Sequence, residues 1–241
     1  MTKPIYAIGD LHGQSAEFDR LLSLIDRDGG PEAQVVFLGD YTDRGPDSRG
    51  VLDRLIAGCA EGRDWIPLMG NHDRMFAWFL EDFPRHDPHL LVGYHWLHER
   101  LGGVETLASY GVVFEGQTRL EDLHAMALQA VPEDHRAFLQ GLVLMHQTPD
   151  LAFVHAGIRP GIALDQQDEN DLVWIRQEFL KHTAPHPKLI VHGHTPVDRV
   201  THCGNRVNLD TGAGYGRPAS AVVFEGRSCW EVTEKGRVSL A

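Results

Sequence analysis

The sequence has 241 residues, of which 42% are hydrophobic and 23% are charged, as expected for a folded domain with a sizeable core. Its net charge of −12 argues against a nucleic-acid-binding or anionic-membrane surface, because both need a basic face. A small anionic substrate is still possible, since a local cluster of cations can reverse the field in one cleft.

Localisation is predicted from the cysteines and the N-terminus. Cys59, Cys203 and Cys229 form no C-x-x-C pair, and "MTKPIYAIGD" runs into the first strand without a hydrophobic leader. No apolar run approaches the roughly 20 residues that span a bilayer. These features predict a reduced, cytoplasmic protein with no membrane partner.

The first third of the chain alternates strand and helix patterns. Short β-branched runs at 5–9, 34–40 and 64–71 predict buried strands. Apolar residues at helical spacing predict helices at 15–27 and 47–59. Strand, helix, strand, helix, strand predicts a parallel sheet with right-handed crossovers.

In the middle of the chain the sequence pattern changes from alternating strands and helices to helices alone. Helical patterns occur at 74–80, 93–111, 120–131 and 133–144, separated by proline, glycine and histidine clusters. We expect one domain over the whole chain, 1–241, that carries a helical insertion at about 85–142.

The second half returns to strand patterns with one helix pattern among them. The expected helix is 171–180, and the expected strands are 151–157, 188–194, 206–210, 220–226 and 229–234. The last strands are joined by short turns, which predicts antiparallel pairing and a second sheet. The expected fold class is therefore mixed α/β (α+β), a two-layer β-sandwich core flanked by helices.

Polar side chains follow the predicted strands where each strand ends. These residues are Asp10, His12, Asp40, Asn71, His72, His155 and His194. Since ligands bind beyond the carboxyl ends of strands in open α/β sheets, we expect these side chains to meet at one rim. Oxygen and imidazole ligands without thiolate suit manganese, iron or zinc. The set is too large for one tetrahedral ion and predicts a dinuclear site, with manganese preferred and iron or zinc as alternatives.

The motifs "GDLHG", "GDYTDRG", "GNHD", "HAG" and "GHT" resemble those of the calcineurin-like metallophosphoesterases. The similarity is greatest to the phosphoprotein phosphatase branch, which includes bacterial serine/threonine protein phosphatases and symmetrical diadenosine tetraphosphatases. The resemblance implies a β-sandwich in which Asp40 bridges two metal ions. It implies that Asp10 and His12 complete one metal site, and that the other is completed by Asn71, His155 and His194.

The same resemblance implies the catalytic residues. Arg44 matches the arginine that binds phosphate, His72 the catalytic histidine and Asp43 the carboxylate that orients it. Arg176, in "DLVWIR", matches a second phosphate-binding arginine of the bacterial relatives. Two cations and two guanidiniums would neutralise the phosphate, a metal-bridging hydroxide would attack, and His72 would protonate the leaving alkoxide.

The expected function is a metal-dependent serine/threonine, or dual-specificity, protein phosphatase. Its partner would be a phosphorylated protein or a small phosphoester. The alternative enzyme is a symmetrical bis(5'-nucleosyl)-tetraphosphatase, which uses nearly the same residues, or another small-phosphoester hydrolase. A non-catalytic scaffold predicts a missing ligand, and a nuclease predicts "GHxH" where this chain has Pro196. The oligomeric state is not predicted.

Other residues near the motifs are expected to have structural roles or to line the cleft. His192 lies two before His194 and is expected to be structural or to support a ligand. Asp210, in "LDTGAG", is expected to bond its own backbone in a turn, and Tyr215 could line the cleft. The aromatic residues of "WLHER" are expected to pack against the core.

Overall fold

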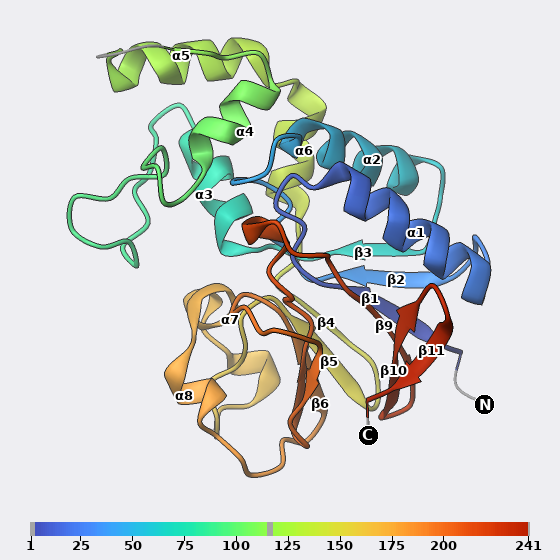
Figure 1. The fold of residues 1–241 in the computed structure, drawn as a ribbon. Helices are drawn as coiled ribbons and strands as arrows, with labels where there is room; N and C mark the ends of the chain where they lie inside the picture. The colour runs from blue at the N-terminus through green and yellow to red at the C-terminus, as the bar shows by residue number, and fades with distance from the viewer. Residues whose placement is uncertain (1–2, 115–117, 241) are drawn as a thin grey trace.

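The computed structural model describes residues 3–114 and 118–240 as two β-sheets packed face to face, with helices on their outer faces (Figure 1). The sandwich with flanking helices predicted from the sequence is confirmed. The first sheet has the order β11-β10-β9-β1-β2-β3. Its strands are β1 (Ile5–Ile8), β2 (Gln34–Phe37), β3 (Trp65–Pro67), β9 (Ala221–Glu225), β10 (Ser228–Thr233) and β11 (Gly236–Ser239).

The parallel part of the first sheet is built from the first third of the chain. β1 pairs with β2, and β2 with β3, both in parallel. The crossovers are α1 (Ser15–Gly29) and α2 (Ser48–Ala60), which cover the outer face of this sheet (Figure 1). Asp47 caps α2 by accepting a hydrogen bond from the Gly50 backbone at 2.9 Å. The predicted order of strands and helices is confirmed here.

The C-terminal strands differ from the expectation. β9 and β10 pair antiparallel, as predicted, but together with β11, which was not predicted, they extend the first sheet instead of forming the second. β9 lies antiparallel beside β1, with Tyr6 opposite Val223. This pairing joins the two ends of the chain, so local sequence patterns could not assign it to a sheet.

The second sheet has the order β4-β5-β6-β8-β7. Its strands are β4 (Met145–Gln147), β5 (Leu151–Val154), β6 (Leu189–His192), β7 (Thr201–His202) and β8 (Arg206–Asn208). Side chains alternate along each strand, so Leu151 and Phe153 join the core between the sheets. Ala152 and Val154 face the outer helices instead.

The predicted helix at 171–180 is two short helices, α7 (Glu169–Trp174) and α8 (Gln177–Leu180). The break has a local cause, because the Leu172 carbonyl accepts a hydrogen bond from the Ala156 backbone at 2.8 Å. A continuous helix would instead use that carbonyl for the amide of Arg176. Arg176 therefore lies at the junction, with φ −130° and ψ −91°.

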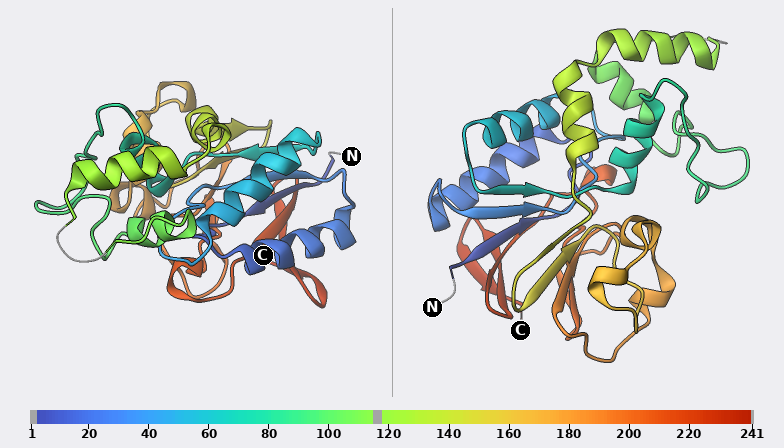
Figure 2. Two further views of the ribbon diagram at one scale, coloured as in Figure 1. Left: turned by 90° about the horizontal axis from the view of Figure 1, so that it is seen from above. Right: turned by 180° about the vertical axis from the view of Figure 1, so that it is seen from behind.

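The connection between α3 (Asn71–Phe79) and β4, here called the α3–β4 connection, carries the helices expected in the insertion. These are α4 (Gly103–Ser109), α5 (Leu120–Ala130) and α6 (Glu133–Gly141), which lie beyond one end of the sandwich (Figure 2). The helix predicted over 93–111 is wrong for residues 93–102, which form turns. Residues 115–117 of the predicted insertion lie outside the described residues.

The sulfur atoms of Cys59, Cys203 and Cys229 form no disulfide. Among the residues described, none of the helices is both long and apolar enough to cross a membrane.

Candidate metal centre

Several of the polar residues after the strands lie in strained backbone. Among the described residues, positive φ at a non-glycine residue is found at His12, Asp40, Asp43, Arg44 and His194. All of them belong to the motifs singled out from the sequence. Such conformations cost about 1–3 kcal/mol each and persist where the surroundings enforce them. The strain turns these side chains away from the strand direction and towards one region.

Asp40 lies between two imidazoles. Its Oδ2 is 3.5 Å from Nε2 of His12, and its Oδ1 is 3.4 Å from Nε2 of His155. The carboxylate therefore presents one oxygen to each histidine, as a bridging ligand would. Its backbone amide donates to Asp73 at 2.7 Å, which fixes the position of Asp40.

Hydrogen bonds define the tautomers of His12 and His155. Nδ1 of His12 lies 2.8 Å from the Thr42 carbonyl, and Nδ1 of His155 lies 2.8 Å from the Leu38 carbonyl. A carbonyl oxygen only accepts, so each Nδ1 carries the proton and each neutral ring has its lone pair at Nε2. A backbone carbonyl behind a metal-binding histidine fixes its orientation in this way.

The second group of candidate ligands lies around His155. Its Nε2 is 3.0 Å from the Asn71 side-chain oxygen and faces an oxygen of Asp40, so lone pairs converge without a proton between them. Both ring nitrogens of His194 lack a hydrogen-bond partner among the described residues, although the residue is only 5% exposed. Buried polar atoms without partners are costly, and a cation would satisfy them.

Geometry selects two groups that could hold a metal ion. Candidate ligand atoms lie within 4.8 Å of one another in the group of His12, Asp40 and His72, and in the group of Asp40, His155 and His194. Asp40 belongs to both, so the clusters are able to hold a dinuclear site. His72 joins the first group in place of Asp10, whose carboxylate accepts the His194 amide at 3.1 Å.

Electrostatics favour cations in this region. Burial lowers the pKa of His12, His155 and His194, so these rings are neutral and available as ligands. Burial, together with the charges of Asp210 and Asp40, raises the pKa of Asp10. Crowded buried carboxylates repel one another until a cation neutralises them.

Two glycines leave room for the carboxylates. A Cβ atom on Gly70 would lie 2.2 Å from Oδ1 of Asp40, and one on Gly193 would lie 2.0 Å from Oδ1 of Asp10. Both distances are far below van der Waals contact. The glycines of "GNHD" and "GHT" are therefore required by the close approach of the candidate ligands.

We expect Gly193→Ala to weaken manganese binding by about 10-fold to 100-fold, because the added methyl group displaces Asp10. Titration calorimetry of the metal-free protein with Mn²⁺ would measure this change. Gly141→Ala is the matched control, since its Cβ would meet nothing within 4 Å. Unchanged affinity in Gly193→Ala would exclude Asp10 from the metal site.

His72 and Asp43 form a buried pair at the edge of the clusters. Nδ1 of His72 is 2.6 Å from Oδ2 of Asp43, and Asp43 is fully buried. Nε2 of His72 accepts a hydrogen bond from Nη2 of Arg44 at 2.9 Å. The other terminal nitrogen, Nη1, donates to Nε2 of His12 at 2.8 Å. Arg44 thus connects His72 of the dyad to His12.

The exposed rim carries the other predicted groups. The Arg44 guanidinium lies over the ring of Tyr215, 5.0 Å from its centroid, and Tyr215 is 64% exposed. Arg176 is also exposed, and its Nη1 lies 3.4 Å from Oγ1 of Thr195, next to His194. Both arginines are therefore within the same region as the clusters, with fewer partners than a buried arginine would need.

His192 lies away from the clusters. It ends β6, where strand alternation directs its ring towards α8, and the ring packs edge-on against Phe179 at 5.0 Å. The positive φ of His194 breaks this alternation, so the two histidines point in different directions. Burial lowers the pKa of His192 to about 3.

Asp210 and Asp73 have roles in holding loops. Asp210 accepts the Gly212 amide at 2.9 Å, as the predicted turn requires, and its burial raises its pKa to about 6. Asp73 accepts backbone hydrogen bonds from Gly70, Asp40, Tyr41 and Thr42. The part played by Asp73 was not predicted, although its place in "GNHD" marked the segment.

The sandwich with paired Asp/His clusters beyond its strand ends defines the class of metal-dependent phosphoesterases. The model of the calcineurin-like phosphoesterase family matches residues 3–224. The chain therefore belongs to the calcineurin-like phosphoesterase family, and it is a metal-dependent phosphatase of the hydrolase class.

Individual relatives agree with this assignment. An asymmetrical bis(5'-nucleosyl)-tetraphosphatase, PrpE, from Halalkalibacterium halodurans is 25% identical, with 90% of this chain and 88% of the relative covered. A Caenorhabditis elegans protein named as a serine/threonine-protein phosphatase is 46% identical over 71 residues. The matched segment is 29% of this chain and only 19% of that relative. A solved structure described as a diadenosine tetraphosphatase has a TM-score of 0.66 at 22% identity and supports the fold (96% and 94% covered).

Proposed function

We propose that this phosphatase removes phosphate from phosphorylated serine and threonine side chains, with phosphotyrosine as a further substrate. Two divalent cations would be held by Asp10, His12 and Asp40 on one side and by Asp40, Asn71, His155 and His194 on the other. Manganese is the preferred ion, with iron and zinc as alternatives, because the ligands are imidazole and oxygen. When bound, the cations would polarise the phosphate and activate a water molecule.

The arginines would bind the substrate. Arg44 donates to two imidazoles here, and its planar fork can turn to two phosphate oxygens instead. Arg176, exposed at the junction of α7 and α8, would contact the same phosphate from the opposite sheet. Their charges would offset those of a dianionic phosphate monoester.

The observation that carries the proposal is the His72–Asp43 dyad. A serine or threonine alkoxide is a poor leaving group and needs a proton as the bond to phosphorus breaks. Once Arg44 turns to the phosphate, Nε2 of His72 would be free to take a proton from water and pass it to the alkoxide, while Asp43 holds the ring through the 2.6 Å hydrogen bond to Nδ1. A nucleotide leaving from a polyphosphate is a far weaker base, so it has less need of such a donor.

Hydrolysis of dinucleoside polyphosphates is the second candidate. It is favoured by the PrpE relative, which is matched over nearly its full length. The exposed ring of Tyr215 beside Arg44 also offers a surface on which a nucleobase could stack.

A side-by-side assay separates the candidates. The manganese-loaded protein would be assayed for phosphate release from a phosphoserine peptide and, by chromatography, for nucleotide release from diadenosine tetraphosphate, with a metal-stripped sample as the control. We expect the peptide to have the larger kcat/KM, and activity to be lost without metal. Faster cleavage of the dinucleotide would overturn the protein phosphatase proposal in favour of the second candidate.

A further inference from the structure

We infer that Trp96 and Thr106, both supplied by the α3–β4 connection, are positioning residues that orient the His72–Asp43 dyad for proton transfer. The inference rests on the proposed role of His72 as the proton donor. It assigns a part in the chemistry to a connection whose helices lie beyond the sandwich, far from the strand-end motifs in the sequence.

The evidence is the set of donors around Asp43. The indole Nε1 of Trp96 donates to both carboxylate oxygens, at 2.9 and 3.1 Å. The hydroxyl of Thr106 donates to Oδ1 at 2.8 Å and accepts from the Asp43 amide, also at 2.8 Å. With His72 on Oδ2, the carboxylate has donors on every side and no free rotation about its terminal bond.

Trp96 is itself held in place. Its ring stacks on Phe76 with centroids 5.0 Å apart and a 20° angle between the planes, and Phe79 lies 4.8 Å away. Both phenylalanines belong to α3, the helix that begins with Asn71 and His72. The helix that carries the proposed proton donor therefore also fixes the indole that orients its partner.

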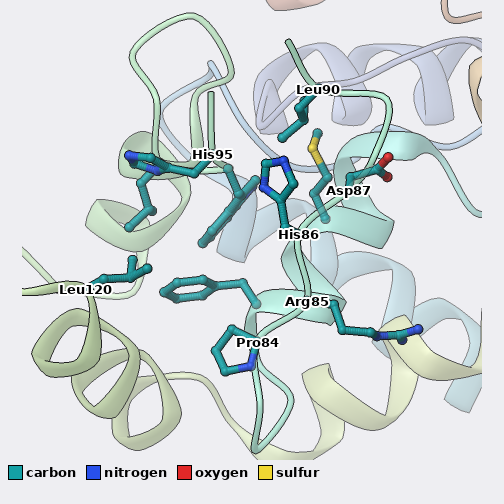
Figure 3. Close-up of a pocket in the computed structure, with 11 residues that line it drawn as sticks. Pro84, Arg85, His86, Asp87, Leu90, His95 and Leu120 are labelled. Atoms are coloured by element: carbon teal, nitrogen blue, oxygen red, sulfur yellow. The ribbon is translucent and has the colours of Figure 1, made fainter. Parts of the chain in front are cut away.

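The connection contacts the Arg44 segment as well. The Arg44 amide donates to the Gly102 carbonyl at 3.3 Å, and a Cβ on Gly102 would lie 2.1 Å from the backbone nitrogen of Arg44. Trp96 also lines a cavity of about 100 Å³, together with His86 and His95, on the connection (Figure 3). Although a cavity lies beside the ring, Trp96 keeps its packing contacts with Phe76 and Phe79 of α3 and its hydrogen bonds to Asp43.

The consequence for catalysis is geometric. A general acid must hold its proton within hydrogen-bonding reach of the leaving oxygen, and small misplacements lower the rate. Removal of the indole N–H leaves Asp43 with fewer constraints and lets the imidazole of His72 tilt. The loss should then affect turnover of substrates that need a proton, and leave substrate binding unchanged.

The first test is Trp96→Phe, which keeps an aromatic ring and removes the donor. For an alkyl phosphate we expect kcat to fall by about 10-fold to 100-fold with KM unchanged, and for 4-nitrophenyl phosphate we expect little change. Trp65→Phe is the matched control, because the Trp65 indole nitrogen has no hydrogen-bond partner among the described residues. Equal losses on both substrates, or none, would overturn the inference.

Thr106 gives a second test that does not depend on the indole. Thr106→Val removes the hydroxyl and should lower kcat for the alkyl phosphate, whereas Thr106→Ser keeps the hydroxyl and should restore it. Thermal unfolding of each variant checks that the protein is folded. Equal activity of the valine and serine variants would contradict a role for the hydroxyl.

A double-mutant cycle separates this inference from the proposed function. If Trp96 acts through His72, Trp96→Phe should cause no further loss in a His72→Asn background, whereas a general structural effect would add to it. If the loss of kcat depends on the leaving group in His72→Asn but not in Trp96→Phe, this inference alone is wrong. If the loss does not depend on the leaving group in His72→Asn, both the proposed role of His72 as general acid and this inference are wrong.

A readout without catalysis completes the test. The Nδ1 proton of His72 can be followed by NMR in the metal-free protein, because its hydrogen bond to a buried carboxylate moves it downfield. We expect it to exchange faster with water in Trp96→Phe than in the parent or in Trp65→Phe. Unchanged exchange would contradict the positioning role even if no substrate were cleaved.

Discussion

Asp40→Asn is expected to abolish hydrolysis and to reduce the bound metal from about two ions per chain to one or fewer. The amide has the shape of the carboxylate but lacks its charge, and its nitrogen cannot act as a ligand. Asp40 faces both His12 and His155 within 3.5 Å, so one substitution affects both clusters. We expect kcat/KM to fall by more than about 10³-fold, equivalent to about 4 kcal/mol of lost transition-state stabilisation.

Metal content would be measured by mass spectrometry and activity by phosphate release on the same samples. Asp28→Asn is the matched control, since Asp28 binds Arg237 and Tyr6 away from the clusters. Its metal content and activity should equal those of the parent. An Asp40→Asn variant that retains full activity would refute a bridging carboxylate.

His72→Asn is expected to keep the bound metal and to lose turnover by about 10²-fold to 10⁴-fold on substrates with alkoxide leaving groups. The loss should be much smaller with 4-nitrophenyl phosphate, whose leaving group needs no proton. Kinetics across a series of leaving groups would measure this difference.

The same variant decides between two roles for His72. Geometry also places this residue in a possible metal-binding group with His12 and Asp40. Reduced metal content in His72→Asn would make it a ligand, and equal loss on all leaving groups would argue against a general acid. His135→Asn, which removes the 2.9 Å pair between the buried His135 and the exposed Asp53, should leave activity per folded molecule unchanged.

The fold was predictable where the pattern is local. The parallel strands, α1, α2 and the residues after the strands follow from apolar runs that end in polar motifs, and the structure contains them. The sheet joined by β9, β10 and β11 was not predictable, because β9 pairs with β1 across most of the chain. No local periodicity encodes which strand edge a segment will find.

The α3–β4 connection shows a different limit. Trp96, Leu97 and Leu101 have helical spacing, but residues 93–102 form turns because tertiary contacts override weak local preference. In that conformation Trp96 reaches Asp43, 53 residues earlier in the chain. The sequence predicts that its aromatic ring packs against the core, which it does, but not that its N–H has a specific acceptor.

The candidate ligands lie on both layers of the sandwich. Asp10, Asp40 and Asn71 follow strands of the first sheet, while His155 and His194 follow strands of the second. Ions bound between them would therefore act as a clamp across the interface of the sheets and favour the folded state over the unfolded one. At a free ion concentration of 100 times the dissociation constant, each such ion adds about 2.7 kcal/mol to the free energy of unfolding. The supply of metal would then determine the stability of the fold as well as the rate of hydrolysis.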